Sequence, residues 1–419
     1  MILPLCRGHA LLLRRFFSYG SADIAFAPYG DYWRQMRKIC TLKLLSAKKV
    51  QSFSPIRQDE VSKLIESVQS SVGSVLDLTS KIYSLTSSIV MRVAIGDKRK
   101  DGAELVKLLH EVLKELGGFC FADLFSSNKL IRLMTGMEAR LWKIHKKVDK
   151  VLEDILQENL RKLKKAEGSD DSDLVEENLA QVLLRIQQGD QNFDVPITSN
   201  NVKAVIWDMF GGGTDTAASV LDWAVSDMMR NPRVMEKAQD EVRKAFKEKK
   251  VTIDDNSEME TCEIKGYEIP IKTQVIIDAW ALGRDPNYWY DAEIFIPERF
   301  QSGKSDIDFK GTNFEFIPFG AGRRICPGIP FGLASIELAL VSLLYHFDWE
   351  LPNGMKPKDL DMTETLGVTA RRKIRVLNWW MHIEITYPCL NFCSLRALLE
   401  NPRILTKMTL TQNLKNPTV

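Results

Sequence analysis

Apolar residues recur every three or four positions over most of the chain, which is the spacing of amphipathic helices. This spacing predicts two long helices, and the second of them runs from Thr198 to Arg230. Thr198 or Ser199 would cap it, and Asn231-Pro232 would end it and begin the next helix. The first long helix shows one apolar face over residues 141–163, made of Leu141, Ile144, Val148, Val151, Ile155 and Leu163.

Shorter elements follow the same logic. Val234, Ala238 and Val242 predict a helix directly after Pro232, and a further helix is predicted after residue 328 from apolar residues at helical spacing. Residues 263–277 alternate between apolar and polar around the turn-like pair Lys265-Gly266, which favours strands. The fold class predicted is therefore mainly α with a minor β component. The residues that predict the last helix are Phe331, Leu333, Ala334, Leu338 and Val341.

Composition narrows the class of protein. The 419 residues are 45% hydrophobic with a net charge of +2, so the chain has a large core and no basic excess for nucleic acid. Seven scattered cysteines indicate no disulfide framework, and the five histidines form no metal motif. The first 17 residues are interrupted by Arg7, Arg14 and Arg15, so they are too short and too charged for a transmembrane anchor.

Residues 319–328, which read FGAGRRICPG, carry the most informative chemistry. Gly322 and Gly328 are expected to adopt backbone conformations closed to other residues, and Arg324 offers a forked donor for a carboxylate. Cys326 would lie beside cations near a helix N-terminus, where thiolate is favoured over thiol. An open thiolate suits a haem iron, while the alternative is an ordinary buried cysteine in a turn.

A second candidate site is the run GGGTDT at residues 211–216, inside the long predicted helix. Three glycines in a helix cost roughly 3 kcal/mol against alanine, so they are expected to make room for something lying against the helix. Thr216 can bond back to a carbonyl one turn earlier or turn its hydroxyl into that space, and Asp215 supplies an acid. The alternative is a glycine loop between two helices. A phosphate cradle is disfavoured, because no lysine follows the glycines.

Two weaker motifs complete the set. Trp33 and Arg37 lie one turn apart on one predicted helical face, and a surface cation–π pair is the ordinary explanation of such spacing. Arg299 stands in the tetrapeptide PERF at residues 297–300, where alone it is one more exposed charge.

Together these motifs resemble the cytochrome P-450 superfamily of haem-thiolate monooxygenases, and residues 26–34 are similar to its plant microsomal members. The resemblance implies a cytochrome P-450 fold around haem b, with Cys326 as the metal ligand. It implies that Trp33, Arg37 and Arg324 bind the haem propionates. The other cofactor-binding positions that it implies are Gly212, Gly213, Phe319, Gly322 and Gly328.

The same resemblance implies the reaction. Asp215 and Thr216 would deliver protons to oxygen bound at the iron, and one oxygen atom of O₂ would enter an apolar small molecule, a terpenoid or another plant specialised metabolite. Electrons would come from NADPH through a flavoprotein reductase at the endoplasmic reticulum membrane, although no N-terminal anchor is seen. The expected apolar substrate pocket is lined by Val205, Ile206, Met209, Phe210, Leu366, Gly367 and Val368.

The chain also departs from the family pattern. The superfamily's E-x-x-R helix should fall near residues 247–262, which contain no such motif; a match from Glu158 to Arg161 lies in the earlier helix, which is the wrong place. Arg299 would pair with that motif and so lacks its carboxylate. We therefore expect an incomplete P-450 domain at residues 21–376 with a deletion near 247–262, flanked by unmatched segments 1–20 and 377–419.

Three departures of this kind are typical of a truncated or mis-spliced product. Two alternatives to an active monooxygenase therefore stay open. One is a non-catalytic product that never holds haem, and the other is a haem-binding protein without turnover.

Overall fold

The described part of the protein is mostly helical. A computed structural model describes residues 16–71, 76–96, 100–117, 136–167, 177–189, 195–245, 263–264, 267–268, 277–300, 307–365, 367–373 and 377–382. The stretch 247–262 and the predicted pocket residue Leu366 lie outside these ranges.

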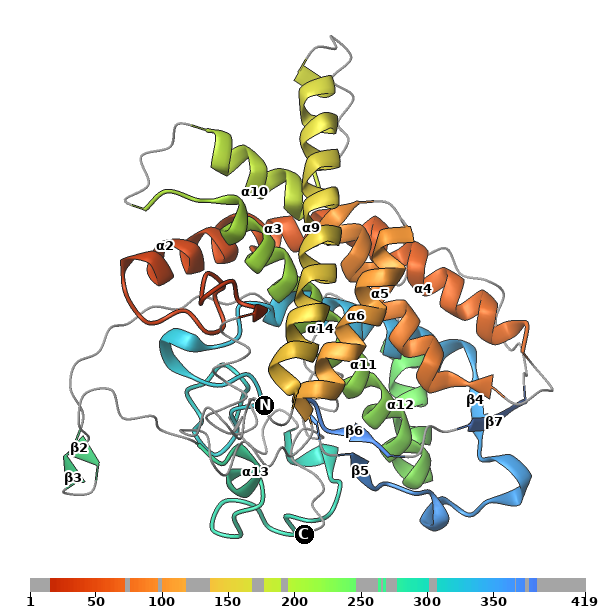
Figure 1. Ribbon diagram of the computed structural model, residues 1–419. Helices are drawn as coiled ribbons and strands as arrows, with labels where there is room; N and C mark the ends of the chain where they lie inside the picture. The colour runs from red at the N-terminus through yellow and green to blue at the C-terminus, as the bar shows by residue number, and fades with distance from the viewer. Residues whose placement is uncertain are drawn as a thin grey trace.

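Helices occupy most of the described chain, from the N-terminal third to α14 (Figure 1). The α-helices are α2 Asp31–Ile39, α3 Ala47–Ser52, α4 Ser54–Gln69, α5 Leu78–Ile95, α6 Lys100–Gly117, α9 Met137–Glu167, α10 Leu179–Gln188, α11 Ser199–Arg230, α12 Pro232–Ala245, α13 Ala279–Leu282 and α14 Ile329–His346. A π-turn, η1 (Cys40–Leu44), extends α2, and short 3₁₀ turns are η2 Pro297–Phe300, η3 Gly322–Arg324, η4 Pro352–Gly354 and η5 Pro357–Asp359.

Helix α11 lies at the centre of the body and packs against α5, α10, α12 and α14. Its N-cap is Thr198, whose hydroxyl accepts a bond from the amide of Asn201, while the Asn201 side chain accepts the Thr198 amide. Asn231 ends the helix and Pro232 begins α12, as the sequence predicts. The three glycines are helical, so the alternative of a glycine loop between two helices is wrong.

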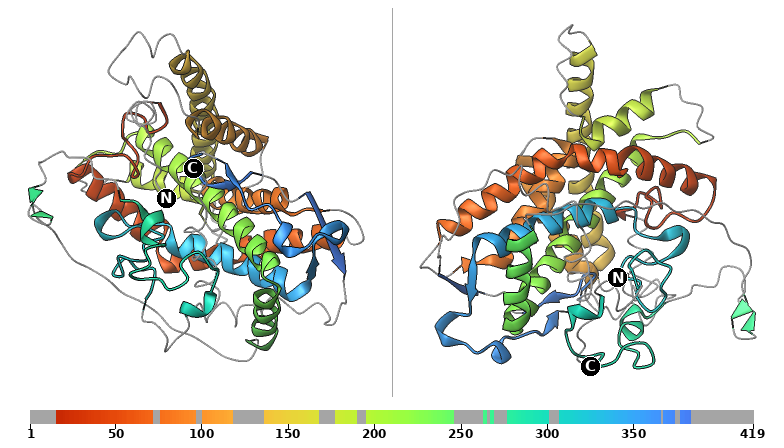
Figure 2. Two further views of the ribbon diagram at one scale, coloured as in Figure 1. Left: turned by 90° about the horizontal axis from the view of Figure 1, so that it is seen from below. Right: turned by 180° about the vertical axis from the view of Figure 1, so that it is seen from behind.

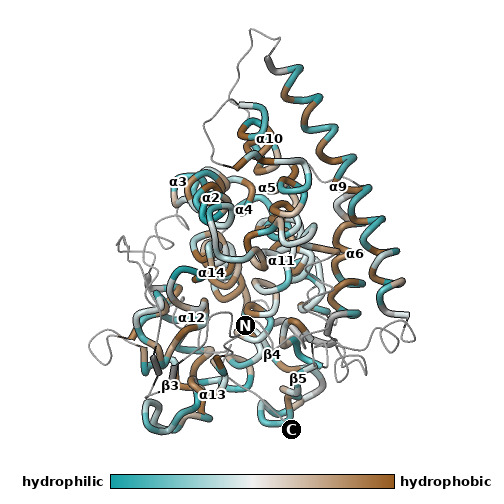
Figure 3. Tube along the Cα trace, turned by 60° about the vertical axis from the view of Figure 1, so that its left-hand side comes forward, coloured by the Kyte–Doolittle hydropathy of each residue, from teal (hydrophilic) through white to brown (hydrophobic). Residues whose placement is uncertain are grey.

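The first predicted long helix is confirmed as α9. Its predicted apolar face is buried throughout, and Figure 3 shows the division between apolar and polar sides along the helix. The upper part of α9 projects beyond the rest of the body in Figure 1. Phe16 and Phe17 are buried beside the N-terminal half of α9, where both rings lie near His145. Phe17 also stacks on Trp207 of α11, with ring centroids 6.0 Å apart.

Helix α14 crosses the body and contacts α4, α11 and α12 (Figure 2). It confirms the helix predicted after residue 328. Its 18 residues are long and apolar enough to span a bilayer, but 72% of them are buried inside the protein. Burial of this extent is what the core helix of a folded domain shows.

The β component is small. A three-stranded antiparallel sheet has the order β1 (Leu76–Asp77), β7 (Leu377–His382), β4 (Asp348–Glu350). Two hairpins stand apart from it: β2 (Glu263–Ile264) with β3 (Tyr267–Glu268), and β5 (Glu364–Thr365) with β6 (Arg371–Arg372). The β2–β3 pair confirms strands at 263–264 and 267–268, and the rest of the predicted stretch, residues 269–276, lies outside the described residues. Strand β7 is the middle strand of its sheet, so the first residues of the predicted tail pair with the body.

Candidate active site around Cys326

The loop before α14 is closed by backbone hydrogen bonds. The amide of Cys326 donates to the carbonyl of Phe319 at 2.9 Å, and the amide of Ile325 donates to that of Gly322 at 3.0 Å. Gly322 has φ +65°, which confirms its predicted conformation. Gly328 does not adopt such a conformation. It is the N-cap of α14 and has φ −87°, a value that any residue can adopt. The second left-handed position is Gly320, at φ +74°.

Cys326 lies exposed on this loop, directly before α14. Partial burial of its sulfur raises the pKa of the thiol, while the amide of Gly328 and the charge of Arg37 act to lower that pKa. The expectation that the loop alone favours thiolate is therefore wrong, because desolvation outweighs the nearby cation. A metal ion bound by the sulfur would favour the thiolate, because it would add a positive charge beside it.

Trp33 and Arg37 converge with Arg324 beside the cysteine. The guanidinium of Arg324 lies 4.7 Å from the centroid of the Trp33 ring and that of Arg37 lies 5.9 Å away. Arg37 donates to the carbonyl of Ile325, so α2 docks on the residue before Cys326. Trp33 is buried, so the pair is more than a surface contact. The spacing correctly placed Trp33 and Arg37 on one face of α2.

Residues 23–27 connect this group to α11. The indole N–H of Trp33 donates to the carbonyl of Ile24 at 3.0 Å, and Arg324 donates to the carbonyl of Ala27 at 2.6 Å. From the other side, the carboxylate of Asp208 on α11 accepts the amide of Ile24 at 2.9 Å. The segment therefore holds the Cys326 loop, α2 and α11 in a fixed relation.

Each glycine of the 211–213 run has a different role. A β-carbon on Gly213 would lie 2.9 Å from Cγ2 of Val90 on α5 and 3.6 Å from the ring of Phe331 on α14. Gly213 therefore permits close packing of α11 against two helices. Gly212 is the open one: a β-carbon there would have no atom within 4 Å. The predicted space beside the helix exists at Gly212 and is filled by Val90 at Gly213.

An open stripe runs along α11 through Met209, Gly212 and Thr216, at helical spacing. Met209 is half-buried, and Gly212 and Thr216 are exposed. Because Phe331 follows Cys326 by five residues and touches Gly213, the stripe and the Cys326 loop belong to one region of the protein. An exposed sulfur, arginine donors and a glycine face without a covering side chain fit a flat anionic ligand such as haem.

The other predicted pocket residues lie in two different environments, the buried core and a partly exposed turn. Val205, Ile206 and Phe210 are buried in the core, with at most 1% of their surface exposed. Gly367 and Val368 are partly exposed on the turn between β5 and β6. Met209 is thus the predicted pocket residue of α11 that lies on the open stripe.

Asp215 and Thr216 point in different directions. The Thr216 hydroxyl donates to the carbonyl of Gly212, which is the first of its two predicted arrangements. Asp215 is buried, and its Oδ1 accepts a hydrogen bond from Arg371 of β6. Its Oδ2 is buried without a hydrogen-bond partner. Arg371 also lies over the ring of Tyr83, 5.0 Å from the centroid.

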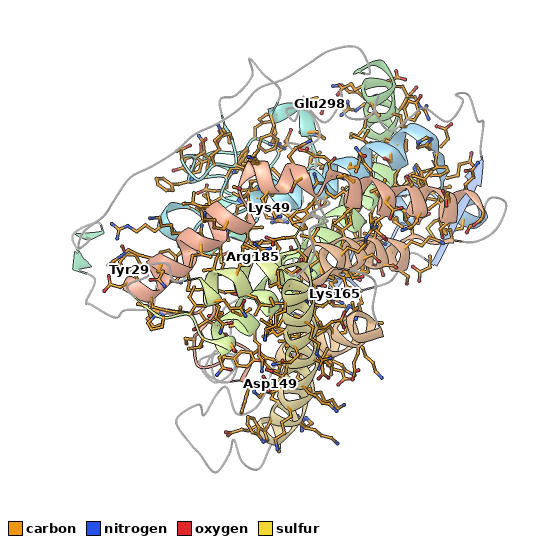
Figure 4. All side chains as sticks on the ribbon, turned by 90° about the horizontal axis from the view of Figure 1, so that it is seen from above. Tyr29, Lys49, Asp149, Lys165, Arg185 and Glu298 are labelled. Atoms are coloured by element: carbon orange, nitrogen blue, oxygen red, sulfur yellow. The ribbon has the colours of Figure 1, made fainter. Side chains whose placement is uncertain are left out.

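The PERF turn is held by its glutamate as well as its arginine. Arg299 donates to backbone carbonyls of its own loop, at 2.8 Å to Tyr290 and 3.0 Å to Ile294, and no ion pair of Arg299 occurs within the described chain. Glu298 instead pairs with Arg233 at 2.7 Å and Lys237 at 3.2 Å, beside α12 (Figure 4). These contacts, Arg233 first, lower the pKa of Glu298 to about 2.

Sequence reasoning missed four residues of this region: Asp208, Glu298, Gly320 and Arg371. Gly320 could have been found, since a loop with two glycines two residues apart allows either to be left-handed. Asp208 and Arg371 could not, because their partners lie more than 150 residues away along the chain.

Comparison with known proteins assigns the site to a class. The sequence profile described as cytochrome P450 matches residues 10–261 and 259–377. The chain is 50% identical to cytochrome P450 71D8 of Glycine max over 389 residues, which cover 87% of this chain and 77% of that protein. It is 48% identical to premnaspirodiene oxygenase of Hyoscyamus muticus and 46% identical to 5-epiaristolochene 1,3-dihydroxylase of Nicotiana tabacum. These alignments cover 87% and 85% of the chain and 77% and 75% of the relatives.

Solved structures agree on the fold. A zebrafish cytochrome P450 determined with progesterone superposes with a TM-score of 0.70 at 20% identity, over 91% of this chain and 90% of that one. The haem domain of cytochrome P450DA gives a TM-score of 0.66 at 15% identity, over 91% of this chain and 83% of that one. At such identities the likeness concerns the fold alone.

The protein has the fold and sequence of a haem-thiolate oxidoreductase. The chain belongs to the cytochrome P450 family, and the three relatives named above are plant proteins. By this membership it is a monooxygenase of the class that binds haem through a cysteine.

Proposed function

We propose that this chain oxidises an apolar small molecule by inserting one oxygen atom of O₂, with haem b bound at Cys326. The observation that carries the proposal is the convergence of Trp33, Arg37 and Arg324 on the Cys326 loop beside the open stripe of α11. A haem held by a cysteine thiolate supplies the cleavage of the O–O bond.

The residues have separable tasks in this proposal. Cys326 provides the sulfur ligand, and Arg37 and Arg324 hold the propionates through charge-assisted hydrogen bonds. The Arg37 guanidinium has five N–H donors, and its bond to Ile325 uses one of them. Gly212 gives a face without a side chain, and Met209 borders it with an apolar surface.

Asp215 and Thr216 form the proposed proton path. Arg371 holds Oδ1 of Asp215, which leaves Oδ2 as the oxygen through which Asp215 would exchange protons in this path. Thr216 donates to Gly212 and can rotate to pass a proton along the stripe, because its side chain is exposed. Asp215 and Thr216, which carry these two tasks, are consecutive residues of α11.

The proposed substrate is an apolar molecule of plant specialised metabolism, a terpenoid or a compound of similar size. Two relatives are named for premnaspirodiene and 5-epiaristolochene, and Met209 and Val368 offer apolar contacts at the partly exposed positions. Electrons come from NADPH through a flavoprotein reductase, at the endoplasmic reticulum membrane where plant members of the family work.

A second candidate function has an observation in its favour. The Arg299 guanidinium is bonded to backbone carbonyls, and residues 247–262 contain no E-x-x-R motif. A chain of this kind could fold without retaining haem, or retain haem without turnover. These two outcomes define the non-catalytic alternatives.

The carbon monoxide difference spectrum of the reduced protein, expressed with a haem precursor, separates these functions. We expect the strongly red-shifted Soret band of a thiolate-bound haem, and we expect Cys326→Ser to abolish it. Absence of the band in the native sequence would overturn haem binding. A normal band without oxidised product, in the presence of reductase and NADPH, would identify a haem protein without turnover.

A further inference from the structure

Two carboxyl groups meet where residues 23–27 dock on α11. The Asp208 carboxylate accepts the amide of Ile24, which is the residue directly after Asp23. Asp23 is 1% exposed; its Oδ1 accepts the amide of Phe26 at 3.0 Å, and its Oδ2 is buried without a hydrogen-bond partner. Asp208 thus bonds the segment to α11, while Asp23 closes a turn within the segment.

Among the described residues, no cation acts on either carboxyl group of this pair. The titratable groups that act on it from neighbouring elements are Tyr32 of α2 and Cys40 of η1. Burial raises the pKa of Tyr32 to about 12 and raises that of the Cys40 thiol as well, so both stay neutral at ordinary pH. Burial also raises the pKa of Asp208, with the charge of Asp23 acting in the same direction, and raises the pKa of Asp23.

We propose that Asp23 and Asp208 together retain one proton and act as a pH-sensitive latch that fixes residues 23–27 against α11. While one carboxyl is neutral, the other can accept backbone amides without repulsion. When both ionise, the charge of the partly exposed Asp208 faces that of the buried Asp23 with no cation from the described residues between them, and the latch opens.

Opening the latch has a consequence for the site around Cys326. The carbonyls of Ile24 and Ala27 are the acceptors for Trp33 and Arg324. Both residues lose an ordered partner when the segment leaves α11. This consequence rests on the proposed function, because it concerns residues assigned to the haem propionates. The latch itself does not, because it is a property of the protein alone.

The test is hydrogen exchange of the full chain without added haem, followed by mass spectrometry of peptides containing residues 23–27. After correction for intrinsic exchange, we expect protection of these peptides to fall with rising pH, at up to about tenfold for each pH unit, the limit for one proton. Asp208→Asn and Asp23→Asn should each remove this dependence. Asp23→Asn leaves the Asp208 bond to Ile24 possible and serves if the other variant fails to fold.

Asp222→Asn is the matched control. Asp222 is a buried acid on the same helix, and the Thr79 hydroxyl donates to it at 2.6 Å, far along α11 from residues 23–27. The control should keep the pH dependence of the 23–27 peptides. The proposal is overturned if wild-type protection does not change with pH, or if Asp208→Asn and Asp23→Asn respond as the control does. Because no haem is present, failure here is distinct from failure of the monooxygenase proposal.

Discussion

The guanidinium of Arg371 donates a hydrogen bond to Oδ1 of Asp215, an acid buried in the middle of α11. The two residues are 156 positions apart, and the contact joins the β5–β6 hairpin to the helix that carries the open stripe. Gly367 and Val368 form the turn of that hairpin. The contact between Arg371 and Asp215 therefore links the proposed substrate contacts to the proposed proton acid.

Arg371→Gln should destabilise the protein, because it leaves the buried Asp215 carboxylate without its cation. The Arg371 side chain is 30% exposed, so we expect a loss on the order of 1–3 kcal/mol, between the values for exposed and buried pairs. Urea denaturation measures it. Arg34→Gln is the control, since Arg34 pairs with Asp31 at the surface, where solvent screens the pair, and this variant should unfold at nearly the same urea concentration as the wild type. Equal losses in the two variants would contradict a buried role for Arg371.

Gly212→Ala and Gly213→Ala should act in opposite directions on stability. Alanine at 213 forces a β-carbon to within 2.9 Å of Val90, and such overpacking costs about 1–3 kcal/mol. Alanine at 212 meets no atom and gains helix propensity of about 0.5–1 kcal/mol in the haem-free protein. Denaturation of both variants without haem tests this. Val90→Ala should partly rescue Gly213→Ala, and destabilisation of similar size at both glycines would refute the assignment.

Thr198→Ala should cost about 1 kcal/mol, because Thr198 is the N-cap of α11 and forms a reciprocal pair with Asn201. The sequence left Thr198 and Ser199 as alternative caps, so Ser199→Ala is the matched control. Ser199 is exposed, and its hydroxyl accepts only a bond from Gln187 at 3.3 Å. We expect less than about 0.5 kcal/mol for that change. Thermal denaturation distinguishes the two, and a larger effect at Ser199 would place the cap there.

Glu298→Gln should destabilise the protein at neutral pH and lose this effect in acid. The pKa of Glu298 is depressed to about 2 by Arg233 and then Lys237, while an unfolded glutamate titrates near about 4.3. The stabilisation is therefore present above about pH 4.3 and is lost as the pH falls towards about 2. Arg233 is 67% exposed, so screening limits the neutral-pH difference to about 1–2 kcal/mol.

Denaturation of wild type and Glu298→Gln at a series of pH values checks this prediction. Arg233→Met provides a double-mutant cycle, whose coupling energy should shrink with the same pH dependence. A stability difference that is constant from neutral to acidic pH would show that the Glu298 charge is not involved.

The sequence predicted the helices better than the contacts between them. Periodicity placed α9, which buries one recurrent apolar face, and apolar spacing also placed α11 and α14, which are buried on most sides. The sequence predicted that the whole glycine run makes room for a ligand. Gly213 instead makes room for Val90 on α5, a residue that no local pattern links to it. Gly328 shows the opposite error, since composition suggested a special conformation and the backbone there is ordinary.

Restoring an E-x-x-R helix between Asp255 and Glu263 should increase haem retention. Arg299 is now bonded to backbone carbonyls at 2.8 Å and 3.0 Å, and a buried carboxylate would give it a charged partner. Removing one member of such a network typically costs about 3–5 kcal/mol, so its return should stabilise the region around Cys326 by a similar amount. The carbon monoxide difference spectrum reports the haem retained. The control is the same insertion with Gln at both charged positions of the motif, and a restored chain that stays haem-free with Cys326 intact would disprove this explanation.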